Sequence, residues 1–208
     1  MKLNSIPWRK IIVYLIYILL IPSIQVTLSP VLRIMGQSFD IMLVFAILAG
    51  FMYGWRDGMI VGAAMGFMRD VLAAPVVPGP EGALSLSFGI GMLVLLLAGL
   101  FGSVFMEGRT NRNFPLGLLA VLCFSLIYKI GGHLVIYLWE SLMAGMNDAP
   151  GVWYVVRTSI LPQVLMNLTA TIPVFALLRY LGPEPYKKKN KDGNKELNYG
   201  DSGKWLTI

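Results

Sequence analysis

The sequence predicts an all-α integral membrane protein with six transmembrane helices and both termini in the cytoplasm. Of its 208 residues, 56% are hydrophobic and only 13% are charged, whereas about a quarter of the residues in a soluble domain are charged. Long apolar blocks recur along the chain, and the alternating ten-residue segments typical of a membrane barrel are absent from the sequence. The lysines and arginines collect in alternate connections between these blocks, which predicts the orientation.

The first apolar block follows Lys2, Arg9 and Lys10, as the apolar region of a signal peptide would. No small-residue cleavage site follows it cleanly, so we expect a retained helix. With this end inside, the cytoplasmic segments hold thirteen of the seventeen lysines and arginines, as the positive-inside rule requires. The six predicted spans cover residues 8–28, 39–53, 58–74, 84–106, 115–143 and 153–181.

The second and third spans are predicted to form an antiparallel hairpin, because the segment GWRDG between them is too short for anything but a tight turn. Asp40 lies 16 positions before the centre of this turn near residue 56, and Asp70 lies 14 positions after it. At a rise of about 1.5 Å per residue, the two carboxylates lie at nearly the same depth, toward the outer face. Arg69 lies at that level too, about 100° around the helix from Asp70. We therefore expect Asp40, Arg69 and Asp70 to form one polar cluster between helices.

Glycines recur in the third span at Gly58, Gly62 and Gly66, and Asp70 is the next residue at the same spacing of four. A step of four drifts only about 40° around a helix, so these residues form one slowly winding stripe. Small residues at this spacing let a neighbouring backbone approach closely, which is how helices associate in lipid. The stripe predicts helix packing at the three glycines and directs Asp70 toward the protein interior.

Three roles are open for the predicted cluster. An unpaired charge in hydrocarbon costs roughly 3 kcal/mol on insertion scales, so structural ion pairing is the favoured interpretation. Docking of a partner protein is the second, and the handling of a ligand or a proton is the third.

The fifth and sixth spans each carry polar side chains four residues apart, which places each pair on one helix face. Lys129 and His133 lie in the fifth span, and Gln163 and Asn167 lie in the sixth. We expect these four side chains to form a hydrogen-bonded network across two facing helices. We also expect Lys129 to face protein or a water-filled cavity rather than lipid.

After Gly182 the composition changes, which divides the chain into a transmembrane domain over residues 1–182 and a basic, disordered cytoplasmic tail over residues 183–208. In this topology the tail lies near the inner leaflet, where each lysine contributes about 1 kcal/mol toward anionic lipid. The lysines nearest the membrane are Lys187, Lys188, Lys189 and Lys191.

The inventory of reactive side chains argues against an enzyme. His133 and Cys123 are the single histidine and cysteine of the sequence, which is a thin supply for a metal site or for an activated nucleophile. Asp40 and Asp70 lie in no motif that indicates an intramembrane aspartyl dyad. The sequence contains no phosphate loop, dinucleotide fingerprint or nucleic-acid module. We therefore expect no catalytic activity, no cofactor, no metal and no nucleic-acid partner.

Short motifs along the spans resemble one family. The segment SFDIMLVFAILAGF supplies Asp40, with Phe39 where a proline is usual, and GFMRDVL supplies Gly66 and Asp70. The segment EGALSLSFGIG then leads into the fourth span with small residues. The last span supplies a polar, a proline and a basic residue in order, which are Asn167, Pro173 and Arg179. In these motifs, over about residues 8–181, the chain resembles MreD, a small membrane protein of the bacterial cell-elongation machinery.

The resemblance implies a non-catalytic scaffold in the bacterial cytoplasmic membrane. Such a scaffold binds a membrane-anchored MreC-like protein and helps to couple cytoplasmic MreB filaments to peptidoglycan synthases. The resemblance also implies a six-helix bundle similar to the substrate-binding subunits of ECF-type vitamin transporters.

The same architecture leaves a second function open, which is a small-solute binding subunit of a transporter for a vitamin or a metal. Such subunits have polar and aromatic groups that converge on an outward pocket. Asp40, Arg69, Asp70 and Trp153 are the candidates here. The predicted outer loops are poor in hydrogen-bonding side chains, which favours the scaffold.

Overall fold

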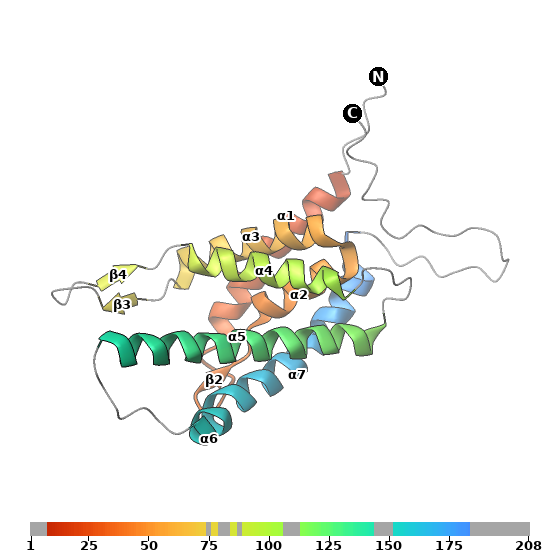
Figure 1. Ribbon diagram of the computed structural model, residues 1–208. Helices are drawn as coiled ribbons and strands as arrows, with labels where there is room; N and C mark the ends of the chain where they lie inside the picture. The colour runs from red at the N-terminus through yellow and green to blue at the C-terminus, as the bar shows by residue number, and fades with distance from the viewer. Residues whose placement is uncertain are drawn as a thin grey trace.

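The computed structural model describes residues 8–73, 76–78, 84–86, 89–105, 113–143 and 152–183, and these are mostly helical (Figure 1). The elements, in chain order, are α1 (Trp8–Leu28), β1 (Arg33–Ile34), β2 (Gln37–Ser38), α2 (Ile41–Tyr53), α3 (Trp55–Ala73), β3 (Val76–Pro78), β4 (Leu84–Leu86), α4 (Ile90–Val104), α5 (Phe114–Met143), α6 (Val152–Val155), η2 (Val156–Ile160) and α7 (Leu161–Leu181). β1 pairs with β2 and β3 with β4, each as a short antiparallel ribbon. From residue 184 on, the predicted basic tail lies outside the described residues.

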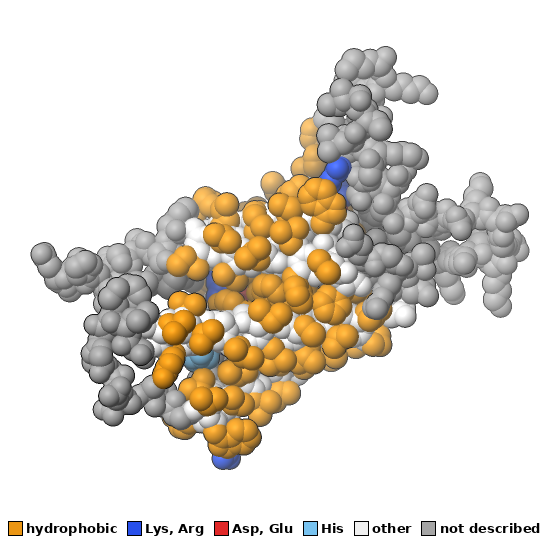
Figure 2. All heavy atoms as spheres, viewed as in Figure 1, with side chains coloured by type: hydrophobic (Ala, Val, Ile, Leu, Met, Phe, Trp, Pro, Cys, Tyr) orange, Lys and Arg blue, Asp and Glu red, His pale blue; other side chains and the backbone are white. Residues whose placement is uncertain are grey.

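Three helical segments of the described chain are long and apolar enough to cross a membrane, which is consistent with a membrane protein. They are Trp8–Leu28, Phe114–Val135 within α5, and Val152–Leu181, which runs continuously through α6, η2 and α7. α2 and α4 are apolar but shorter. Figure 2 shows hydrophobic side chains over most of the face that α4 and α5 present, as lipid contact requires.

α2 is the centre of the bundle. It contacts α1, α3, α4, α5 and α7, and every residue of the helix except Ile41 is buried. Asp40 is its N-cap, and the side chain accepts a hydrogen bond from the Leu43 N–H. The helix ends at Gly54, whose φ of 93° lies in the left-handed region that a side chain disfavours. This single residue turns the chain into α3, so the predicted hairpin is confirmed.

α3 and α4 pack with their backbones in contact, and the predicted glycine stripe forms this α3–α4 interface. A Cβ at Gly58 would lie 2.5 Å from the Gly99 carbonyl oxygen, and a Cβ at Gly62 would collide with the Leu95 carbonyl oxygen. At Gly66 it would collide with the Cα of Met92. The packing role predicted for the three glycines is therefore confirmed, and the partner is α4.

Several predicted boundaries differ from the structure. The second helix begins at Ile41 rather than at residue 39, because the Asp40 side chain caps it. The third begins at Trp55 rather than at residue 58, because Gly54 alone makes the turn. The prediction that the fourth span begins at residue 84 is wrong. Residues 84–86 are extended in β4, and helix α4 starts at Ile90 after Gly89, which has a φ of 99°.

The sixth span contains a π-helical segment, η2, between α6 and α7. Pro162 follows it in the first turn of α7, where its missing N–H leaves one backbone carbonyl of the preceding turn without an α-helical partner. A wider turn at this point accommodates that loss.

One end of the bundle is held together by side chains from the first helix. The Asp57 carboxylate of α3 accepts a hydrogen bond from Tyr14 at 2.9 Å and pairs with Lys10 at 2.6 Å. Tyr17 donates to the Leu181 carbonyl at the end of α7 at 2.8 Å. The start of α1, the α2–α3 turn and the end of α7 thus share one end, as the predicted topology requires. The predicted polar cluster lies at the opposite end.

Candidate functional site

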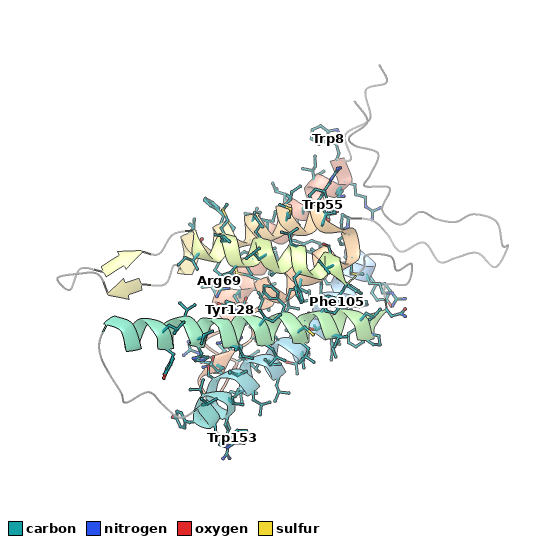
Figure 3. All side chains as sticks on the ribbon, viewed as in Figure 1. Trp8, Trp55, Arg69, Phe105, Tyr128 and Trp153 are labelled. Carbon is teal, nitrogen blue, oxygen red and sulfur yellow. The ribbon has the colours of Figure 1, made fainter. Side chains whose placement is uncertain are left out.

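An ion pair joins α3 to the start of α2. The Arg69 Nη1 donates to the Asp40 Oδ2 at 3.0 Å, which confirms that the two residues lie at one depth. The Arg69 Nη2 also donates to the Tyr128 hydroxyl of α5 at 3.3 Å. Figure 3 shows Arg69 and Tyr128 side by side between the α3–α4 layer and α5. Arg69 therefore connects three helices.

Asp40 has structural partners besides Arg69. Its Oδ1 caps α2 through the Leu43 N–H at 3.0 Å. Its own backbone N–H donates to the Asn167 Oδ1 of α7 at 2.9 Å. The residue is 8% exposed, so these contacts are largely shielded from the surroundings of the protein. Asp40 thus fixes the start of α2 against α3 and α7.

Asp70 forms a separate site. Its carboxylate accepts hydrogen bonds from three backbone N–H groups at the start of α4, with Gly89 at 2.9 Å, Gly91 at 2.9 Å and Met92 at 3.0 Å. The first N–H groups of a helix have no partner within the helix, and they carry its partial positive charge. A carboxylate from α3 therefore caps α4 in place of its own N-cap residue, Gly89, which has no side chain.

The predicted single cluster of Asp40, Arg69 and Asp70 is therefore wrong in one part. Arg69 pairs with Asp40, but the partner of Asp70 is a helix N-terminus. The inward direction predicted for Asp70 is confirmed, because the residue is 2% exposed. The charge of Asp70 is compensated by oriented N–H dipoles and needs no cation.

The predicted network of the fifth and sixth spans crosses the two helices, but with other partners. The Asn167 Nδ2 donates to the Ser125 Oγ of α5 at 3.0 Å, and the His133 Nε2 lies 2.9 Å from the Ser159 Oγ of η2. Neither Lys129 nor His133 forms a hydrogen bond with Gln163 or Asn167. This part of the prediction is wrong because serines provide the facing groups.

Lys129 and Gln163 turn instead to the segment that leads into α2. The Lys129 Nζ donates to the Gln37 Oε1 at 3.2 Å. The Gln163 Nε2 donates to the Ser38 carbonyl at 2.6 Å and lies 3.4 Å from the Asn167 Oδ1. The expectation that Lys129 faces protein or a cavity is confirmed.

Gln25 of α1 is a functional candidate that the sequence analysis missed. Its Nε2 donates to the Phe39 carbonyl at 2.8 Å, and its Oε1 accepts from the Ile41 N–H at 2.7 Å. The available signal was a side-chain amide inside the apolar first span, where a polar group requires a partner.

These side chains surround a cleft of about 380 Å³, which we call the polar cleft. Arg69, Asp40 and Lys129 supply charged groups to it, while Asp70 and Trp153, two of the candidates for an outward pocket, do not line it. Within the described part of the chain, its lining comprises Gln25, Val26, Ser29, Ser38, Phe39, Asp40, Met42, Arg69, Leu72, Tyr128, Lys129 and Gln163. Among the described residues, no group of three histidine, cysteine or acidic side chains is placed to hold a metal ion.

No protein-family model, curated protein or solved structure matches this chain. The residues of the site are therefore interpreted from their own geometry.

Proposed function

We propose that the chain is a non-catalytic, MreD-like scaffold of the bacterial cell-elongation machinery. In this proposal six helices span the cytoplasmic membrane, both termini are cytoplasmic, and the bundle resembles the substrate-binding subunits of ECF-type transporters. It binds an MreC-like membrane-anchored protein and couples MreB filaments to peptidoglycan synthases.

One observation carries the proposal, which is the use of Asp40, Asp70 and Asn167, three of the residues on which the resemblance rests. Asp40 caps α2 and pairs with α3, and Asp70 caps α4. Asn167 joins the start of α2 to α5. All three side chains form contacts between helices, which supports a role in building a rigid bundle.

The order of the described helices supports the proposed topology as well. Each of the six predicted spans contains a helix, and successive helices run in alternating directions (Figure 1). α2 and α4 are short for a bilayer, but in a bundle of longer helices the local bilayer and flanking residues adjust to such differences.

The decisive experiment is co-purification with an MreC-like, single-span coiled-coil protein encoded beside the gene for this chain. In mild detergent we expect the two proteins to elute as one complex at a fixed ratio. An unrelated six-span protein with the same tag is the control. Failure of the partner to bind, together with tight binding of a vitamin, would contradict the scaffold proposal.

The polar cleft is the observation that favours the second candidate, a small-solute binding subunit. An adjacent pair of ATPase genes would support that function, and so would vitamin binding that survives purification. A complex with the MreC-like protein and no vitamin binding would exclude it.

A further inference from the structure

The polar cleft lies where five helices meet, at the end of the bundle opposite the α2–α3 turn. α1 contributes Gln25, α2 Met42, α3 Arg69, α5 Lys129 and α7 Gln163. A volume of about 380 Å³ is within the range of clefts that bind small ligands, roughly 300–1,000 Å³. The cleft is therefore large enough for more than a few waters.

The charges that line the polar cleft do not balance. Arg69 and Lys129 are cations, while Asp40 is the one acidic residue among the described residues of the lining, and it already pairs with Arg69. The ammonium of Lys129 reaches the neutral Gln37 side chain, and no described carboxylate lies within ion-pair distance of it. Over the part of the chain that the structure describes, one positive charge therefore remains in a region where an unmatched charge is costly.

We propose that the polar cleft binds a phosphate-bearing ligand, with the phosphate held by Lys129 and Arg69. An ammonium and a guanidinium are the two side-chain groups that proteins use for phosphate, through charge-assisted hydrogen bonds. A monoanionic phosphate diester compensates the one unmatched charge and leaves the Arg69–Asp40 pair in place. The ligand is bound, not transformed.

The margin of the polar cleft indicates where such a phosphate comes from. Val26 of α1 and Leu72 of α3 line the cleft, and each of these apolar side chains is 48% exposed. A polar interior with an apolar, exposed margin fits an amphipathic molecule, whose headgroup enters while its acyl chains stay at the margin. A lipid phosphate is the expected source, and a free phosphate is the other source of the same chemistry.

This inference does not rest on the scaffold proposal, because a scaffold can carry the lipid or lack it. The test uses the full-length chain in detergent, titrated with dioctanoyl phosphatidylglycerol, with dioctanoylglycerol and with inorganic phosphate, and read by native mass spectrometry. We expect the phospholipid to bind more tightly than the diacylglycerol, which has the same acyl chains without the phosphate. Tighter binding of the phospholipid than of inorganic phosphate assigns a lipid source, and the reverse assigns a free anion; both outcomes support the proposal.

Variants separate the cleft from general lipid contact. Lys129→Gln should weaken phosphatidylglycerol binding roughly tenfold, as the loss of one charge-assisted contact does, and Lys129→Arg should restore most of it. Arg157→Gln is the matched control, because Arg157 is an exposed cation on η2 outside the cleft. Unfolding measurements on each variant show that it is folded. Equal binding of phospholipid and diacylglycerol without binding of inorganic phosphate, or an equal effect of Lys129→Gln and Arg157→Gln, would overturn the proposal.

Discussion

The α3–α4 interface and the polar cleft lie on two faces of α3, and the charged side chains on these faces have different surroundings. On the first face, backbone meets backbone at the glycines, and Asp70 is 2% exposed with three N–H donors on its carboxylate. On the second face, the Arg69 side chain is 28% exposed and borders a cleft with a surplus of positive charge. The adjacent residues Arg69 and Asp70 thus have different structural roles. Asp70 caps α4, while Arg69 pairs with Asp40 and lines the polar cleft.

The largest effect on stability should come from disrupting the α3–α4 interface. In Gly62→Ala the new Cβ collides with the Leu95 carbonyl oxygen, so the α4 backbone must move. We expect a loss of about 3 kcal/mol in the free energy of unfolding, at the upper end for overpacking. Gly132→Ala is the matched control, because a Cβ there meets nothing within 4 Å and the substitution favours the helix. Reversible unfolding in mixed micelles measures both variants, and equal stabilities would contradict the assigned interface.

Removal of the charge from Asp70 should have the next largest effect. In Asp70→Asn, one of the two oxygens that accept N–H groups becomes an amide nitrogen that cannot accept. We expect a loss of about 2 kcal/mol, as for a buried cap with an unsatisfied donor.

Hydrogen exchange makes this prediction local. The Gly91 and Met92 amides at the start of α4 should exchange faster in Asp70→Asn, whereas the Leu43 amide, capped by Asp40, should be unchanged. Unchanged exchange at the start of α4 would show that Asp70 is not its cap.

A smaller effect on stability is expected from Arg69→Gln, at the polar cleft. The variant removes the partner of Asp40, but the partial exposure of the guanidinium reduces the cost of the lost pair. We expect a loss of about 1 kcal/mol, measured in the same micelles. A loss larger than that of Asp70→Asn would mean that the Arg69–Asp40 pair, and not the α4 cap, is the main electrostatic support of the bundle.

The smallest effect is expected from Lys129→Gln, which removes a cation that borders the cleft and bonds one neutral amide. Its stability should stay within about 0.5 kcal/mol of the parent, while its lipid binding falls. A large loss of stability would show that Lys129 stabilises the bundle, and the polar cleft would then not differ from the α3–α4 interface in this respect.

Much of the α3–α4 interface could be predicted from the sequence, because it follows from helix periodicity. The spacing of Gly58, Gly62 and Gly66 predicts a close neighbour, and the tight turn predicts equal depth for Asp40 and Asp70. Spacing does not say which helix is the neighbour. The partner of Asp70 was not predicted, because the fourth span was expected to begin at residue 84, whereas α4 begins at Ile90 after Gly89, which has no side chain to cap it.

The partners of Lys129 and Gln163 could not be predicted from helix periodicity. Gln37 and Ser38 lie in β2, part of the ribbon that connects α1 to α2 and brings polar groups against α5 and α7. A periodicity argument places residues on helix faces and leaves such a connection without a position. The expected bonds from Lys129 and Gln163 to each other's helix therefore went to this ribbon instead.

The burial of α2 has a consequence for the surrounding bilayer. With 13 residues, α2 is about 20 Å long, which is shorter than a hydrocarbon core of about 30 Å. Five helices contact α2, and every residue of it except Ile41 is buried. The apolar surface that remains exposed belongs to the outer helices, which are the long α1 and α5 and the shorter α4. Changes in bilayer thickness should tilt those helices while the α2 ends, including Asp40, keep their contacts.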